Sequence, residues 1–282
     1  MSASSTVGRR GFVVAVQVKR LILIVACALT LLPLLWLFSA SFSSEASLFA
    51  APLVPENFTL DNYGELFSDT SFLRWVRNSL IVCTAGGLLA LALTTSMGYA
   101  FARMRFRGRR SGLLGLFLLQ MIPSSITIIA IYYLLSMAGL LNSHLGLALV
   151  YAGTNIPFSA WLLKGFFDSI PTELEEAALV DGATPVQAMV RIVLPLALPM
   201  MAAVFLFNVI AFYNDYVLAS IVLTGSDTYT VALGLRFFQS AQGADWALFS
   251  AGALAGALPL VLIFYGMQRY LVGGLTAGAV KG

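Results

Sequence analysis

The chain has few of the residues that commonly carry out catalysis. Its 282 residues include a single histidine, His144, and only three lysines, Lys19, Lys164 and Lys281. None of these lysines precedes Ser or Thr, so the chain lacks the G-x-x-x-x-G-K-[ST] loop that binds nucleotide phosphates. One histidine cannot form the H-E-x-x-H zinc site, and the G-x-S-x-G nucleophile motif is absent. We therefore predict no catalytic residue, no metal site and no cofactor bound by this chain.

The scarce reactive residues fit structural positions. His144 follows Asn142 and Ser143, but neighbours in sequence rarely face each other, and a nucleophile with its base depends on geometry. This short polar stretch is typical of a turn, and we interpret it as an external turn. The two cysteines, Cys27 and Cys83, lie in long apolar segments, which favours packed side chains over a disulfide.

Charge is also scarce. Charged residues make up 10% of the chain and hydrophobic residues 59%, with a mean hydropathy of +0.89, values that a water-soluble domain of this size would not tolerate. An apolar helix of about 20 residues crosses the hydrocarbon core of a bilayer. Six segments are long and apolar enough, namely residues 21–41, 79–102, 113–141, 145–167, 196–223 and 246–268. The prediction is an all-α membrane protein with six transmembrane helices.

This prediction divides the chain into three regions. Residues 1–20 form a cytoplasmic N-terminal segment, residues 21–270 the transmembrane domain, and residues 271–282 a cytoplasmic C-terminal tail. Prolines within membrane helices are tolerated where neighbouring groups satisfy the freed carbonyls. We therefore interpret the prolines in or beside the apolar segments as kinks, namely Pro33, Pro123, Pro157, Pro199 and Pro259.

The basic residues set the orientation, because cytoplasmic flanks retain Lys and Arg. If six helices alternate, 13 of the 16 basic residues fall on one side, and only Arg74, Arg77 and Arg236 fall on the other. We therefore predict that both termini are cytoplasmic. A cleaved signal peptide is the alternative for the N-terminus, because a basic start, an apolar run and small residues at 40–46 also fit that pattern. Cleavage would leave five spans.

Residues 168–195 are too polar to stay in lipid, and their sequence predicts a hairpin of two short helices. Thr172 and Glu175 have the spacing of a capping box at the start of the first helix. Gly182 is expected to end that helix in the left-handed conformation. Thr184 and Gln187 repeat the capping-box spacing at the start of the second helix.

The second helix of the hairpin has one apolar face. Pro185 takes the first helical position, where proline is favoured, and Pro195 is expected to end the helix before the next span. Its apolar residues recur at helical spacing: Val186, Met189, Val190 and Val193. The membrane surface is one partner for such a face. However, the first helix is acidic and anionic lipid would repel it, so a basic groove on another protein is the better match.

The hairpin resembles a known signature. Glu-Ala-Ala-x-x-x-Gly, followed by nine residues and Ile-x-Leu-Pro, is typical of the permease subunits of bacterial ATP-binding-cassette (ABC) importers. It is carried here by Glu176, Ala177, Ala178, Gly182, Ile192, Leu194 and Pro195. The resemblance implies that the hairpin, including Asp181, couples the permease to a separate ATPase. Glu176 would face a basic residue there, and Gly182 would supply the tight turn.

Other stretches are similar to the carbohydrate-importing branch of this family. They are residues 181–185, 229–234 and 274–282, the last resembling the tail of the smaller permease in maltose and trehalose importers. The resemblance implies a second permease subunit, two ATPase subunits that bind ATP and Mg²⁺, and an extracytoplasmic sugar-binding protein. It also implies a bacterial cytoplasmic membrane and no nucleic acid. Lys281 and Gly282 would touch the ATPase, and residues 224–245 would enter the sugar-binding protein.

Two other functions stay open. One is import of a non-sugar solute, such as glycerol 3-phosphate or a polyamine, although few basic residues could line the spans for a phosphate ligand. The other is a secondary transporter, although the two halves show no repeat and such a protein would not need the hairpin signature.

Four polar residues are candidates for the translocation pathway: Asn155, Tyr213, Asn214 and Asp215. An ionisable group is costly inside a bilayer, so Asp215 is expected to face the bundle interior or water, which favours the pathway or an external vestibule. Asparagine also links membrane helices through hydrogen bonds, and both roles stay open for Asn155 and Asn214.

Overall fold

A computed structural model describes residues 4–44, 57–239 and 244–276 of the chain. These residues are helical throughout, apart from turns, loops and one isolated bridge between Ser43 and Phe58. The chain divides into two compact units, which are described separately. The first unit is Met1–Thr70 with Phe238–Ala255, and the second is Ser71–Phe237 with Gly256–Gly282.

The first unit is built around an apolar helix, α1 (Ser4–Ser41), and a short helix, α2 (Asp61–Ser68). Asn62 of α2 donates through its side-chain amide to the carbonyls of Ser41 and Ser43, each at 2.9 Å. The rings of Phe42 and Phe58 stack with their centroids 5.0 Å apart. The bond to Ser41 satisfies the last carbonyl of α1, and the other contacts fix the chain that follows the helix.

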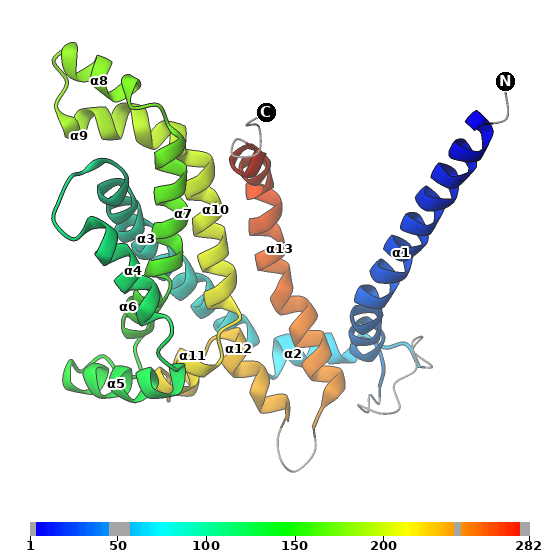
Figure 1. Ribbon diagram of the computed structural model, residues 1–282. Coiled ribbons are helices and arrows are strands. Elements are labelled where there is room, and N and C mark those ends of the chain that lie inside the picture. The colour runs from blue at the N-terminus through cyan, green and yellow to red at the C-terminus, as the bar shows by residue number, and fades with distance from the viewer. Residues whose placement is uncertain (1–3, 45–56, 240–243, 277–282) are drawn as a thin grey trace. The chain divides into compact units, whose positions relative to one another are not determined.

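The second unit is organised around α3 (Phe72–Arg103), which packs against α6 (His144–Thr154), α7 (Ile156–Ser169) and α10 (Leu194–Tyr213) (Figure 1). Gly98 permits a close approach of α3 to α7. A Cβ atom at this position would lie 3.0 Å from the Cβ of Leu163 and 3.1 Å from the amide nitrogen of Lys164.

Two of the predicted spans are broken rather than kinked. The segment expected at 113–141 forms α4 (Arg109–Leu119) and α5 (Ser124–Met137), with Pro123 in an extended conformation between them (ψ 131°). The segment expected at 145–167 forms α6 and α7, which meet at Asn155 with a bend of 51°. Pro157 lies in the first turn of α7, where its missing N–H costs nothing. The interpretation of Pro123 and Pro157 as kinks is therefore wrong.

The segment expected at 196–223 is also divided. Helix α10 ends at Tyr213, and a separate short helix, α11 (Val217–Val222), follows residues 214–216. The chain continues through η2 (Ser226–Thr228), α12 (Val231–Gly234), η3 (Leu235–Gln239) and α13 (Trp246–Thr276). Pro33, Pro199 and Pro259 lie inside continuous helices, as predicted.

Among the described residues, four helices are long and apolar enough to cross a membrane, or five if α6 and α7 together form one span. The all-helical membrane architecture is thus confirmed, whereas the count of six spans stays a prediction. Cys83 is buried in α3 as expected, whereas Cys27 is exposed on α1, and both are free thiols.

Candidate functional site

The predicted hairpin is present at one end of the second unit. Its first helix is α8 (Glu173–Val180) and its second is α9 (Pro185–Ala188), and the two lie beyond the ends of α7 and α10 (Figure 1). Gly182 has φ +87°, which confirms the left-handed turn. The amide of Ala183 donates to the carbonyl of Ala178 at 2.9 Å, and that of Gly182 to Leu179 at 3.1 Å. These two bonds are the Schellman arrangement that closes a helix on a glycine.

The second capping box is confirmed. The amide of Gln187 donates to the hydroxyl of Thr184 at 3.3 Å, and the amide of Thr184 donates to the side-chain oxygen of Gln187 at 2.9 Å. Pro185 occupies the first turn of α9. Local residues alone therefore fix how the second helix of the hairpin begins.

The expectation that Pro195 ends this helix is wrong. From α9 the chain passes through a π-helical turn, η1 (Met189–Val193), directly into α10, and residues 185–213 form one continuous helix. The amide of Leu194 bonds to the carbonyl of Met189, five residues back. The wider turn places Pro195 at the start of α10, where its missing N–H removes no α-helical bond. The second helix of the hairpin and the span after it thus form one continuous helix.

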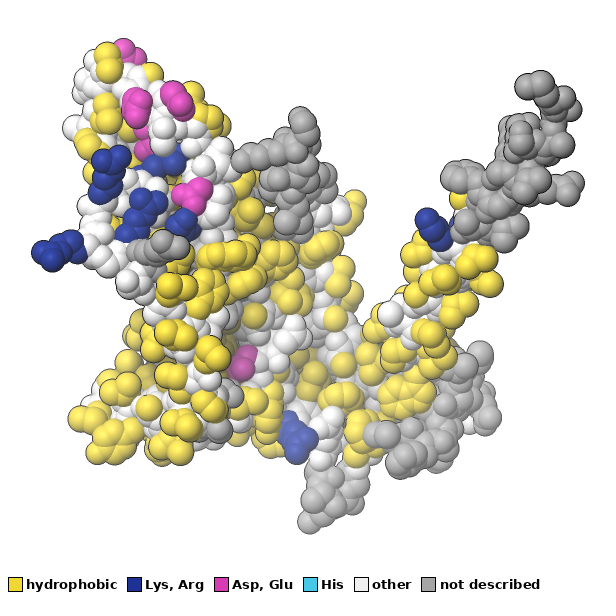
Figure 2. All heavy atoms as spheres, viewed as in Figure 1, with side chains coloured by type: hydrophobic (Ala, Val, Ile, Leu, Met, Phe, Trp, Pro, Cys, Tyr) yellow, Lys and Arg dark blue, Asp and Glu magenta, His cyan; other side chains and the backbone are white. Residues whose placement is uncertain are grey.

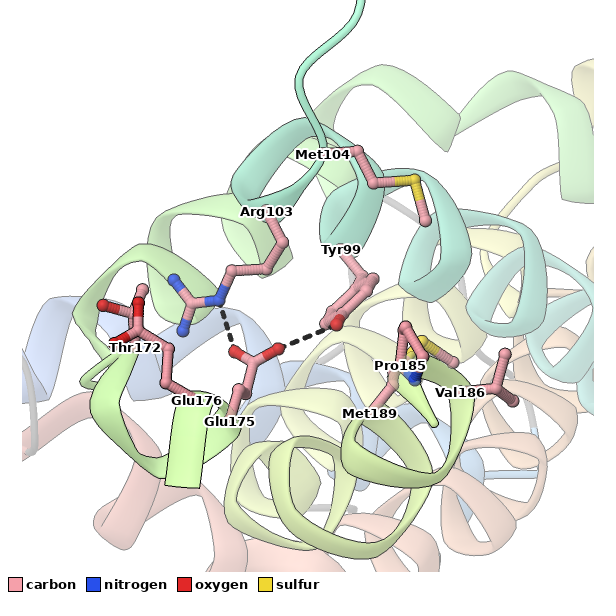
Figure 3. A pocket seen from close by; sticks show the side chains of 9 residues that line it. All are labelled: Tyr99, Arg103, Met104, Thr172, Glu175, Glu176, Pro185, Val186 and Met189. Carbon is pink, nitrogen blue, oxygen red and sulfur yellow. Dashed lines mark hydrogen bonds and ion pairs between the residues drawn. The ribbon is translucent and has the colours of Figure 1, made fainter. Parts of the chain in front are cut away.

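The first capping box is also wrong. The side chain of Thr172 makes no cap hydrogen bond, and Glu175 turns away from it towards α3. One carboxylate oxygen of Glu175 accepts a 2.5 Å bond from Nε of Arg103, and the other accepts a 2.7 Å bond from the hydroxyl of Tyr99 (Figure 3). The side chains of Arg103 and Glu175 are only 12% and 11% exposed. A partner 72 residues away has replaced the local one.

The outer face of the hairpin is exposed. Glu176, Ala177 and Asp181 are exposed with Gly182, whereas Ala178, Ile192 and Leu194 are half-buried and Pro195 is exposed. Val180 is 88% exposed and Val186 67% exposed. An acidic surface with apolar side chains between the carboxylates is suited to a basic groove with an apolar floor.

A hollow of about 320 Å³ lies between the hairpin and the end of α3 (Figure 3). Its lining includes Tyr99, Arg103, Glu175, Glu176 and Val186. Figure 2 shows that charged side chains gather at this end of the second unit, while hydrophobic side chains dominate the rest of its visible face. This division is typical of the boundary between a water-exposed surface and a membrane-embedded region.

Two of the pathway candidates join helices. The side-chain amide of Asn155, between α6 and α7, donates to the side-chain oxygen of Asn208 in α10 at 3.2 Å, and Ser159 donates to the same oxygen at 3.2 Å. Tyr213 is buried, and its hydroxyl donates to the carbonyl of Gly256 in α13 at 2.6 Å. Hydrogen bonds of this kind hold membrane helices together.

The other two candidates lie at the break after α10. Asn214 is exposed, and its amide donates to the carbonyl of Ile210 at 2.8 Å. One oxygen of Asp215 accepts from the amides of Leu218 and Ala219 at 3.0 and 3.2 Å, which caps the start of α11, and from the hydroxyl of Tyr151 at 3.2 Å. Asp215 also lines a largely apolar cavity of about 660 Å³, together with the polar side chains of Gln120, Thr127 and Thr154.

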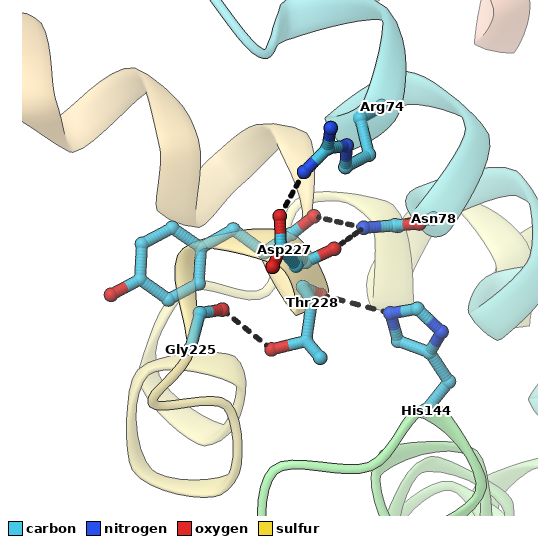
Figure 4. Close-up of polar contacts among 7 residues, drawn as sticks. Arg74, Asn78, His144, Gly225, Asp227 and Thr228 are labelled. Carbon is cyan, nitrogen blue, oxygen red and sulfur yellow. Dashed lines mark hydrogen bonds and ion pairs between the residues drawn. The ribbon is translucent and has the colours of Figure 1, made fainter.

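At the opposite end of the second unit, the loop after α11 is fastened to α3 and α6 (Figure 4). The side-chain amide of Asn78 donates to the carbonyls of Asp227 and Tyr229 at 2.9 and 3.0 Å, and Arg74 pairs with Asp227. Nε2 of His144 lies 3.0 Å from the carbonyl of Thr228. His144, the first residue of α6, thus contacts a backbone carbonyl of the loop. Ser143 caps α6 by accepting a hydrogen bond from the amide of Gly146.

Comparison with known proteins identifies the family. The family described as "Binding-protein-dependent transport system inner membrane component" matches residues 90–276, about two thirds of the chain. The chain belongs to this family. It is therefore the permease subunit of an ABC importer, a transport subunit rather than an enzyme, and the predicted multi-pass membrane protein is confirmed.

Curated relatives match the permease over most of its length. The "Galactooligosaccharides transport system permease protein GanQ" of Bacillus subtilis is 39% identical over 257 residues, covering 89% of this chain and 90% of that protein. The "Maltose/maltodextrin transport system permease protein MalG" of Vibrio parahaemolyticus is 38% identical over 274 residues, covering 90% and 92%. A solved bacterial ABC transporter "involved in the import of the acidic polysaccharide alginate" matches with a TM-score of 0.80 at 22% identity, covering 96% of the permease and 99% of that chain. The structural likeness shows the same fold.

Sequence reasoning missed several residues of the permease. Arg103 and Tyr99 were not expected at the hairpin, although they lie four residues apart near the end of a span and so share one helix face. The role of Asn208, whose side-chain oxygen accepts hydrogen bonds from Asn155 and Ser159, was also not predicted. The predicted ATPase contacts Lys281 and Gly282 lie outside the described residues.

Proposed function

We propose that this permease is one half of a two-permease pore that imports a carbohydrate across the bacterial cytoplasmic membrane. A di- or oligosaccharide such as trehalose, maltose or maltodextrin is the proposed substrate. The observation that carries this proposal is the match to relatives at 38–39% identity whose names give galactooligosaccharides and maltose/maltodextrin. Import of a non-sugar solute is less well supported, because these names all refer to saccharides.

We further propose that the α8–α9 hairpin docks in a cleft of a separate ATPase, with Glu176 facing a basic residue. The exposed acidic and apolar side chains on its outer face support this role. ATP and Mg²⁺ would be bound by two ATPase subunits. Their closure would move the hairpin and open the pore outward to receive sugar from an extracytoplasmic binding protein. Nucleotide can drive this change only by binding one state more tightly than the other.

The continuous helix from α9 to α10 supports this mechanism. Because no flexible loop separates the hairpin from the span, a displacement of α9 can reach the membrane region directly. The proposed topology has six spans with both termini in the cytoplasm. It treats α4 with α5, and α6 with α7, as spans that are broken in the middle. Such breaks are found in membrane proteins where the backbone is covered by protein or lines a cavity.

Asp215 is the proposed polar residue of the translocation pathway, because it combines an ionisable side chain with a cavity. Asn155, Tyr213 and Asn214 are weaker proposals, since the first two already bond to neighbouring helices.

The test is affinity purification of the permease in mild detergent from its native membrane. Wild-type chain is expected to recover a second permease and a P-loop ATPase. Glu176→Arg places a positive charge against the proposed basic site, so this variant should keep the second permease and lose the ATPase and sugar uptake. The second permease serves as the internal control for folding. ATPase retained by Glu176→Arg together with normal uptake would refute the coupling role.

A further inference from the structure

The buried contact between Arg103 and Glu175 is the strongest feature that the family assignment leaves unexplained. Glu175 precedes the signature glutamate, Glu176, and the two side chains have different surroundings. Glu176 is exposed, whereas Glu175 is buried against the permease itself. We infer that Arg103 and Glu175 are positioning residues for transport, which fix the coupling hairpin to α3 so that movement of α8 also moves α3.

The contact joins three elements in one rigid arrangement. Arg103 uses Nε to bind the carboxylate of Glu175 at 2.5 Å and Nη2 to bind the carbonyl of Ile170 at 2.7 Å, just after α7. Tyr99 binds the second carboxylate oxygen at 2.7 Å. The planar guanidinium fixes the direction of its bonds, and charged hydrogen bonds of this length are strong. The ends of α3 and α7 and the start of α8 are therefore held in one orientation.

The core below this contact is already packed. Tyr99, Ala102, Phe167 and Ile170 belong to one buried cluster, in which the rings of Tyr99 and Phe167 meet edge to face at 5.9 Å. Close packing couples α3 to α7 without any charged group. The Arg103–Glu175 pair adds α8 to these helices, and it is an ion pair between the hairpin and a span.

A buried ion pair is a poor means of gaining stability, because well-packed apolar residues often serve equally well. The clearest effect of the Arg103–Glu175 pair is to fix the orientation of α8 relative to α3. The second helix of the hairpin is continuous with α10, whereas the first is tied to α3 through Glu175. An ATPase that displaced the hairpin would then move α3 together with α10, which the covalent connections of the hairpin to α7 and α10 do not by themselves ensure.

The experiment compares sugar uptake and ATP hydrolysis by the complete transporter in proteoliposomes. Glu175→Gln keeps the shape of the side chain but removes its charge. We expect it to assemble with the second permease and the ATPases, and to transport about tenfold less sugar per ATP hydrolysed, the loss equivalent to one charged hydrogen bond. Asp168→Asn is the matched control, because it removes a carboxylate paired with Lys164 within α7 alone. It should leave the ratio unchanged.

Arg103→Met/Glu175→Met provides the second variant, since replacing both charges with apolar side chains avoids an unpaired buried charge. The same fall in sugar transported per ATP is expected from an assembled complex. A normal ratio would overturn the inference, because packing alone would then carry the movement. Failure of this variant to fold would also overturn it, because the pair would then serve the fold and not the coupling.

The inference rests on the proposed coupling function, but the two fail separately. If the hairpin does not couple to an ATPase, Glu176→Arg will retain both ATPase and uptake. If the hairpin couples but the buried pair does not position it, Glu176→Arg will lose the ATPase while Glu175→Gln behaves as the wild type.

Discussion

Two carboxylates that are adjacent in sequence have opposite environments at the hairpin. Glu175 is buried in an ion pair, and Glu176 is exposed. On α8, consecutive side chains point about 100° apart, so one turn of helix can face both its own protein and a partner. The signature Glu-Ala-Ala therefore supplies mainly the outer part of this turn, with Glu176 and Ala177 exposed and Ala178 half-buried. The inward half is supplied by a residue outside the signature.

Gly182 provides a test at the level of a single residue. Its φ of +87° is costly for any residue with a side chain, at about 1–2 kcal/mol. Gly182→Ala is expected to loosen the turn between α8 and α9 and to weaken ATPase retention, measured by co-purification under increasing detergent wash. Gly165→Ala is the control, because a Cβ there meets nothing within 4 Å and the residue lies in ordinary helix. Equal retention by both variants would show that the left-handed turn does not limit docking.

Among the helices, the positions of the apolar segments were easier to predict from the sequence than the points where a helix is interrupted. Apolar segments were placed well because burial in lipid depends on local hydropathy, which the sequence states directly. Whether a proline bends or divides a helix depends on neighbours that satisfy the freed carbonyls, so Pro123 and Pro259 look alike in sequence but differ in structure. The two capping-box patterns in the hairpin show the same limit. Thr184 and Gln187 bond to each other within the hairpin. Glu175 instead forms an ion pair with Arg103 of α3, 72 residues away in the sequence.

The close packing of α3 on α7 yields a prediction for these elements. Gly98→Val would force its side chain against Leu163 and the backbone of Lys164, and overpacking of this kind typically costs about 1–3 kcal/mol. We expect a lower thermal stability in detergent, measured by loss of the monodisperse complex on heating. Gly115→Val in α4 is the matched control, since a Cβ at Gly115 meets nothing within 4 Å. Equal melting of the two variants would contradict the proposed close approach.

For the whole permease, the sequence and the family match indicate the same class of protein. The property to measure at this scale is the membrane topology, that is, which end of the second unit faces the cytoplasm. Charged side chains gather at the end of the second unit that carries the hairpin (Figure 2), and the loop between α11 and α12 lies at the other end (Figure 1). Selective retention of basic residues predicts that the hairpin end is cytoplasmic. Much of sugar selectivity is expected to depend on partner proteins, which explains why this chain alone predicts a substrate class and not one sugar.

Topology can be tested with a membrane-impermeant maleimide in a Cys27→Ser/Cys83→Ala background. Arg105→Cys and Ser226→Cys place one thiol at each end, both at exposed positions. Ser226→Cys should react in intact spheroplasts, and Arg105→Cys only in inside-out vesicles. Labelling of both positions from the same side would contradict the six-span arrangement.

The loop after α11 has a consequence for how related permeases diverge. It is held mainly by its backbone, since Asn142 accepts from the amides of Thr224 and Gly225 and Asn78 donates to the carbonyls of Asp227 and Tyr229. Backbone contacts do not depend on which side chains the loop carries. Related permeases can therefore keep the same backbone path in this loop while an exposed side chain such as that of Ser226 is substituted. The chemistry of the loop surface can change in this way without a change in the loop conformation.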